Sequence, residues 1–177
     1  VNISRAECTP VQMLYGREGA NVCAIELIQT VARRETEDRI GADLVASVLS
    51  GEIDMDTVYA RLSRLGYAPD TASTQIVIAI DEHDAKGQAR RVANDLVWAA
   101  QGRNRLAVAL KHGNLMLVLA EWPTQASELA IKSWLAQIND SAGNCSIGVS
   151  RKTRDINELE QAIVQAIEAC EMGQRVQ

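Results

Sequence analysis

Several signatures that would define a function are missing from this chain of 177 residues. Asp and Glu outnumber Lys and Arg by 23 to 18, so the basic face needed for sequence-independent nucleic-acid binding is missing. Neither a Gly-x-x-x-x-Gly-Lys-Ser/Thr nor a Gly-x-Gly-x-x-Gly phosphate-binding motif occurs. No apolar run is long enough to span a bilayer, and Val1–Pro10 lacks the features of a signal peptide. We therefore expect a cytoplasmic protein without a membrane partner.

Cysteine and histidine are also scarce, and their positions are scattered. The four cysteines are Cys8, Cys23, Cys145 and Cys170. None of them belongs to a Cys-x-x-Cys pair, so we interpret them as reduced and mostly buried side chains rather than zinc ligands. The two histidines, His83 and His112, lie beside predicted turns, and no motif brings them to a nucleophile or a carboxylate. We expect no metal, no cofactor and no catalytic residue.

The first third of the chain predicts one long helix. Thr9 and Pro10 supply a capping hydroxyl and a proline at the first helical position, and no other proline occurs before Gly51. Apolar residues recur at helical spacing on both sides of the polar run Arg33–Arg39. A helix that is apolar at both ends and polar in the middle bridges two packed bodies. We favour a continuous helix that pairs with its copy in a homodimer; an ordinary helix broken near the charges is the alternative.

The rest of the chain alternates between helical and strand patterns. Asp54 or Asp56 caps a short helix that ends at Gly66. The later elements are a strand at 74–80, a helix from Asp84 to Gln101, strands at 106–111 and 115–121, a helix that starts at 122–124, a strand at 144–150, and a helix that begins with a capping box of Asp155 and Glu158 and ends at Gly173.

From residue 74 this order is β-α-β-β-α-β-α, and its first six elements form the split βαβ arrangement of a ferredoxin-like sheet. We predict an α+β fold, a βαββαβ sandwich with a four-stranded antiparallel sheet and two crossover helices on one face, preceded by the long helix. The predicted domains are the helix at 1–51, the α+β domain at 52–173, and the start of a linker at 174–177.

A hairpin at 106–122 carries the first candidates for ligand binding. Gly113 and Asn114 are typical of a two-residue hairpin turn. Together with Lys111, their amides could face a phosphate, although a plain turn explains the same residues better.

An acidic tip at the end of the first strand carries another candidate. Asp81 begins a cluster that ends at Asp84, and the end of a strand is a usual place for a metal ligand. The neighbouring hairpin offers Leu115 and Met116 instead of further oxygen ligands. A solvated turn with a helix cap therefore explains the tip better, and Asp81, Gly113 and Asn114 stay only as candidates for binding an unidentified ligand.

These motifs together resemble a known family. Gly66–Asp70 (Gly-Tyr-x-x-Asp), the strand that ends in Asp81, the hairpin 111–119 and the Ser-Ile-Gly-Val sequence at 146–149 are similar to the degenerate GGDEF-like domain of PucR/CdaR-type bacterial transcription regulators. In active GGDEF cyclases the hairpin reads Arg-Tyr-Gly-Gly-Asp-Glu-Phe. The matching positions here are Lys111, His112, Gly113, Asn114, Leu115, Met116 and Leu117. The resemblance places the family's strand-end metal carboxylate at Asp81.

The resemblance extends to the N-terminal helix and implies a function. Residues 9–51 resemble the last helix of a GAF-type sensor running into a signalling helix. Family members continue into a helix-turn-helix domain, so the resemblance implies a fragment of a longer regulator that contacts DNA only through a domain outside this sequence. The implied function is a non-catalytic regulatory and dimerisation module that relays a sensor signal.

Two other functions stay open. The domain could sense a nucleotide or a small metabolite near Asp81 and the Gly113–Asn114 turn. It could also be an active cyclase, but the hairpin lacks the carboxylates that two-metal phosphoryl transfer requires.

Overall fold

Strand β1, Thr74–Asp81, lies at the centre of the fold and is buried along its whole length. In the computed structural model it pairs antiparallel with β3, Leu115–Trp122, on one side and with β4, Ile147–Val149, on the other. Strand β2, Ala107–His112, pairs with the outer side of β3, which gives the order β2-β3-β1-β4. The predicted four-stranded antiparallel sheet is therefore confirmed.

The structure describes residues 10–68, 73–81, 87–122, 133 and 145–174. The predicted helix that starts at 122–124 lies almost entirely outside these residues, as does the predicted cap Asp84. Of the two crossover helices expected on one face of the sheet, only α3, Gln88–Gln101, is described. Within the described residues, no helix has both the length and the apolarity needed to cross a membrane.

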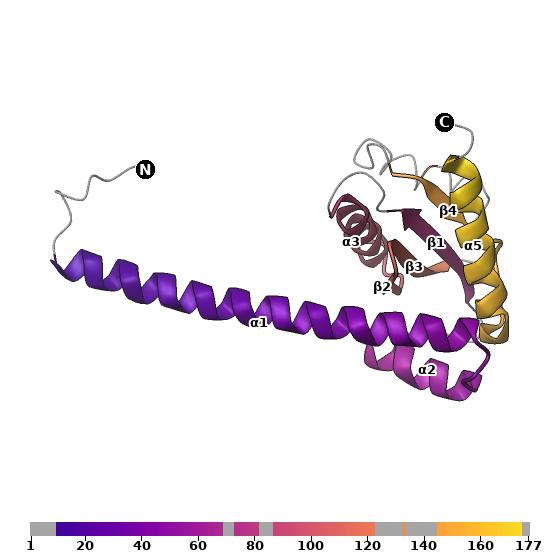
Figure 1. Ribbon diagram of the computed structural model, residues 1–177, viewed down its shortest axis with the longest axis horizontal. Helices are drawn as coiled ribbons and strands as arrows, with labels where there is room; N and C mark the ends of the chain where they lie inside the picture. The colour runs from indigo at the N-terminus through magenta and orange to yellow at the C-terminus, as the bar shows by residue number, and fades with distance from the viewer. Residues whose placement is uncertain (1–9, 69–72, 82–86, 123–132, 134–144, 175–177) are drawn as a thin grey trace. The chain divides into compact units, whose positions relative to one another are not determined.

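The side chains of β1 alternate between two separate hydrophobic cores. Figure 1 shows α3 beside β1 on one face of the sheet. Ile76, Ile78 and Ile80 point to α3, where Val92 and Leu96 are fully buried. On the other face, Val77 and Ala79 pack in a second core. This second core is built with residues from α5 (Leu159–Gln174), α2 (Met55–Arg64) and the C-terminal end of α1 (Pro10–Leu49). The sheet is thus covered on both faces, as its nearly all-apolar central strand requires.

Helix α1 is continuous from Pro10 to Leu49, as predicted, and spans the boundary between two units of the chain, Val1–Glu37 and Asp38–Gln177. In the second unit, Leu44, Val45 and Val48 of α1 are buried in the core that also contains α5. In the first unit, every described residue from 15 to 29 is exposed.

Two contacts attach the end of α1 to its unit. The carboxylate of Asp38 forms an ion pair with the guanidinium of Arg90 on α3, and both side chains are about 30% exposed. Three residues further on, Gly41 lies against strand β2: a Cβ atom at this position would be 3.2 Å from Cδ2 and 3.4 Å from Cα of Leu110. A glycine allows this close approach of helix and strand.

Two further predicted helix caps, at the starts of α2 and α5, have different outcomes. Asp54 caps α2 by accepting a hydrogen bond from the amide of Thr57 at 2.9 Å, as predicted. The predicted capping box of Asp155 and Glu158 forms only in part: the Asp155 carboxylate accepts a hydrogen bond from the amide of Asn157 at 2.9 Å, but Glu158 does not accept one from the amide of Asp155. The Glu158 carboxylate accepts a hydrogen bond from the hydroxyl of Thr153 at 2.6 Å, and the amide of Asp155 donates to that hydroxyl. Thr153, two residues before Asp155, therefore lies between the two groups that a capping box would join directly, and the 3-10 turn Ile156–Glu158 precedes α5.

Helix α5 approaches the sheet closely at Gly148 of β4. A Cβ atom there would lie 2.1 Å from the carbonyl oxygen of Ala166 and 2.3 Å from the amide nitrogen of Cys170. Both atoms belong to the backbone of α5, so a side chain cannot be accommodated by a change of rotamer. The glycine of the Ser-Ile-Gly-Val sequence is therefore a packing requirement.

We predict that Gly148→Ala lowers the free energy of unfolding by roughly 3 kcal/mol or more, because α5 must move away from β4. Gly173→Ala is the matched control. Gly173 lies in α5, the helix that packs on Gly148, and no atom lies within 4 Å of the added carbon. This control should leave stability unchanged or raise it by up to about 1 kcal/mol. Urea denaturation followed by circular dichroism measures both; equal stability of the two variants would contradict the packing requirement.

Candidate functional site at the hairpin end of the sheet

The turn of the β2–β3 hairpin consists of two residues, Gly113 and Asn114, between the paired residues His112 and Leu115. Gly113 has a φ of +57°, and Asn114 is not among the residues with positive φ. This combination is typical of a type II′ turn, which needs glycine at its first central position. Both turn residues are exposed, and the predicted hairpin is confirmed.

The last residue of β1, Asp81, is brought to this hairpin by the strand register. Asp81 pairs directly with Leu115, which follows the Gly113–Asn114 turn. The amide of Asp81 donates a hydrogen bond to the carbonyl oxygen of Ser146 at 3.1 Å, and the residue is only 4% exposed. The three ligand candidates predicted from the sequence therefore lie at the same end of the sheet.

A cysteine from α5, which the sequence does not connect with this site, lies beside Asp81. The Cys170 thiol is fully buried and donates a hydrogen bond to the carbonyl oxygen of Ser146 at 3.2 Å. Burial raises the pKa of this thiol to about 11, and the negative charge of Asp81 adds to the effect. Cys170 is thus a protonated donor at neutral pH. Its inward position on α5 follows from helical periodicity, but its proximity to Asp81 depends on the packing of distant segments.

The hairpin positions that carry carboxylates in active GGDEF cyclases are occupied by apolar side chains that pack inward. Met116 is 3% exposed and belongs to the core below α3. Leu117 is fully buried in the opposite core, against which Leu115 is partly buried. Among the residues that the structure describes, no group of three or more His, Cys, Asp and Glu side chains could hold a metal ion. In the described site, the residues beside Asp81 are therefore Cys170, with its thiol, and Leu115.

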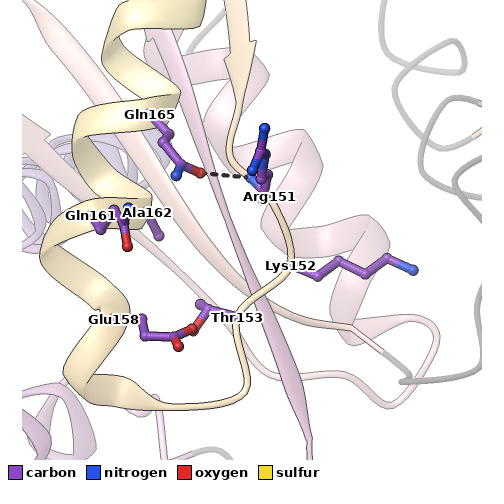
Figure 2. Close-up of a pocket in the computed structure, with 7 residues that line it drawn as sticks. All are labelled: Arg151, Lys152, Thr153, Glu158, Gln161, Ala162 and Gln165. Carbon is purple, nitrogen blue, oxygen red and sulfur yellow. Dashed lines mark hydrogen bonds between the residues drawn. The ribbon is translucent and has the colours of Figure 1, made fainter.

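A separate hollow of about 180 Å³ lies between α5 and the segment that follows β4. Figure 2 shows its lining, with Thr153 facing Glu158 at one end and Gln165 facing the backbone of Arg151 at the other. The Gln165 side chain accepts a hydrogen bond from the amide of Arg151 at 3.2 Å. The side chain of Lys152 extends away from the hollow.

This hollow is not part of the predicted site. Thr153 pairs with Gln75, near the start of β1, whereas Asp81 is its last residue. Six residues of an extended strand separate the two positions by about 20 Å. The hollow is polar and lies apart from the ligand candidates.

We predict that iodoacetamide alkylates Cys170 far more slowly than the exposed Cys23 in the folded protein. Raising the thiol pKa from 9 to about 11 lowers its thiolate population roughly a hundredfold, and burial blocks access as well. Because the pKa is raised in the folded state, the stability that this thiol contributes is present below about pH 9 and is lost as the pH rises toward 11. Mass spectrometry after timed alkylation, with a sample in urea as control, measures the rates; equal native rates would contradict this account of the site.

Comparison with known proteins agrees with this geometry. No curated protein matches the chain significantly. The family model of the GGDEF-like domain matches residues 50–172, which is more than half of the chain and includes β1, the hairpin, β4 and almost all of α5. The chain therefore belongs to the GGDEF-like domain family.

Proposed function

We propose that the protein is a non-catalytic regulatory and dimerisation module of a cytoplasmic bacterial transcription regulator of the PucR/CdaR type. It relays the state of an N-terminal sensor to a DNA-binding domain outside this sequence. The observation that carries the proposal is helix α1, which contributes core residues at one end and presents exposed apolar side chains along the other.

The exposed part of α1 supports the dimerisation role. Ile25, Leu27 and Ile28 are each more than half exposed, although they are large aliphatic residues within about one turn of the same helix. Apolar surface of this extent marks an interaction site. A second copy of the same helix covers it in an isologous interface, the commonest arrangement of homodimers.

The attached part of α1 supports the relay role. The ion pair of Asp38 with Arg90 connects the helix to α3, and Gly41 connects it to Leu110 on β2. Strand β2 leads directly into the Gly113–Asn114 turn. Because packed interiors transmit displacements instead of absorbing them, a shift of this helix end must be accommodated by the hairpin or by α3.

The hairpin supports the non-catalytic part of the proposal. Joining two GTP molecules requires metal ions that neutralise the phosphates. At the matching positions, Leu115 and Met116 are packed against the cores, so Asp81 receives no carboxylate from the hairpin. The same substitutions that remove metal ligands add apolar contacts to the fold.

The dimerisation role predicts different effects for two adjacent substitutions. Ile28→Asp places a charge on the exposed apolar side of α1, so we expect its dimer dissociation constant to rise at least about a hundredfold. Gln29→Asp is the matched control on the polar side of the same helix, and we expect it to remain dimeric. Sedimentation velocity of both variants and of the parent chain measures the association; a parent chain that stays monomeric at high concentration would contradict the proposal.

A sensor for a nucleotide or a small metabolite is the second candidate, and the polar hollow beside α5 is the observation that favours it. Under the first proposal, titration calorimetry with GTP, with and without Mg²⁺, should give no binding heat, and the same incubation should yield no cyclic dinucleotide. Saturable heat without product would favour the sensor. Gln165→Ala, which changes the hollow, would then show which site binds the ligand: loss of the heat would indicate the hollow, and unchanged heat would indicate the hairpin site. Product formation would contradict both candidates.

A further inference from the structure

Two opposite charges interrupt the exposed apolar surface of α1 at equal distances from its middle. Arg17 and Glu35 are 18 residues apart, which is five full turns of an α-helix, so they lie on the same side. Ala24, Ile28 and Val31 lie within roughly 40° of the line that joins them. We call these five residues the apolar stripe with its terminal charges.

All five residues are exposed within the unit Val1–Glu37, and the two large aliphatic ones are 67% (Ile28) and 45% (Val31) exposed. The stripe coincides with the middle of the apolar side of residues 20–32, while Glu26, Gln29 and Arg33 lie on the opposite side of the helix. A second helix that covers the apolar side must therefore contact Arg17 and Glu35 as well.

Parallel and antiparallel pairing place these two charges opposite different residues of the second copy. In a parallel pair each residue lies at the level of its own copy, so Arg17 faces Arg17 and Glu35 faces Glu35. In an antiparallel pair centred on residue 26, Arg17 of each copy lies level with Glu35 of the other, and the twofold axis generates this pair twice. Ala24 then lies level with Ile28 of the second copy, so that a small residue meets a large one.

We propose that the occupant of the apolar stripe is a second copy of this chain in antiparallel orientation, with Arg17 of each copy paired to Glu35 of the other. This proposal rests on the dimerisation role proposed above and adds its direction. Electrostatic complementarity selects the orientation: the antiparallel arrangement gives two attractive contacts, whereas the parallel arrangement gives two repulsive contacts.

Distance measurement between spin labels tests the orientation on the full chain. Cys8, Cys23 and Cys145 are replaced by Ser, and Thr36→Cys carries the label on the flank of the helix, about 100° from the stripe. Residue 36 is ten positions from the centre, so antiparallel pairing separates the two labels by about 30 Å along the axis. Parallel pairing leaves them at the same level, at a distance set by the width of two helices, below about 25 Å.

Glu26→Cys is the matched control, because residue 26 is level with itself in both orientations and lies opposite the stripe. Its label pair should give the same short distance in either case and thereby reports that a dimer is present. A short distance for the Thr36→Cys label would overturn the antiparallel proposal and leave the dimerisation role intact. Absence of any distance for both labels would overturn both proposals.

Charge exchange provides a second, independent measurement. Arg17→Glu should raise the dimer dissociation constant about tenfold, because two attractive contacts become repulsive ones, and Glu35→Arg should do the same. The double variant R17E/E35R should recover the affinity of the parent chain. In a parallel dimer Arg17→Glu exchanges one like-charge contact for another, so an unchanged dissociation constant would contradict the antiparallel arrangement.

Discussion

Burial of β1 on both faces is the constraint on which the rest of the structure depends. A strand with isoleucine side chains on one face and valine and alanine side chains on the other is stable only between two apolar layers. Helix α3 supplies one layer. The other consists of α5, α2 and the C-terminal end of α1, so this end of the long helix is part of the fold and not an addition to it. The candidate site follows from the same constraint, because the register that buries β1 also sets Asp81 opposite Leu115.

Much of this fold could be predicted from local patterns. The hydrophobic run of β1, the Gly113–Asn114 turn and the proline-free first helix are each encoded within a few neighbouring residues. Helix α3 begins at Gln88 after Gly87, which has a φ of +81°. The cap predicted for this helix, Asp84, lies outside the described residues. A carboxylate before a helical pattern is a common cap, whereas a left-handed glycine at this position has no distinct sequence pattern.

The candidate site was predictable only in part, for a physical reason. Asp81 and the hairpin turn could be placed together because the predicted split βαβ arrangement sets the second hairpin strand beside the first strand of the sheet. The proximity of Cys170 to Asp81 depends on how closely α5 packs on β4, and that distance is determined by Gly148, more than twenty residues earlier in the chain. The Thr153–Glu158 hydrogen bond spans only five residues, but the capping-box pattern does not include it because that pattern considers only residues within one turn.

The hairpin illustrates how a fold can keep its geometry while its chemistry changes. Met116 and Leu117 alternate between the two cores because successive residues of a strand point to opposite faces. A carboxylate at Met116 would need water or a metal ion to satisfy it, but this position is almost fully buried below α3. Because an apolar layer covers this strand, a charged residue at Met116 could be hydrated only if the core opened. The surface that is left for interaction is then the exposed length of α1, where the same helical periodicity produces an apolar side with no neighbour in the described part of its own unit.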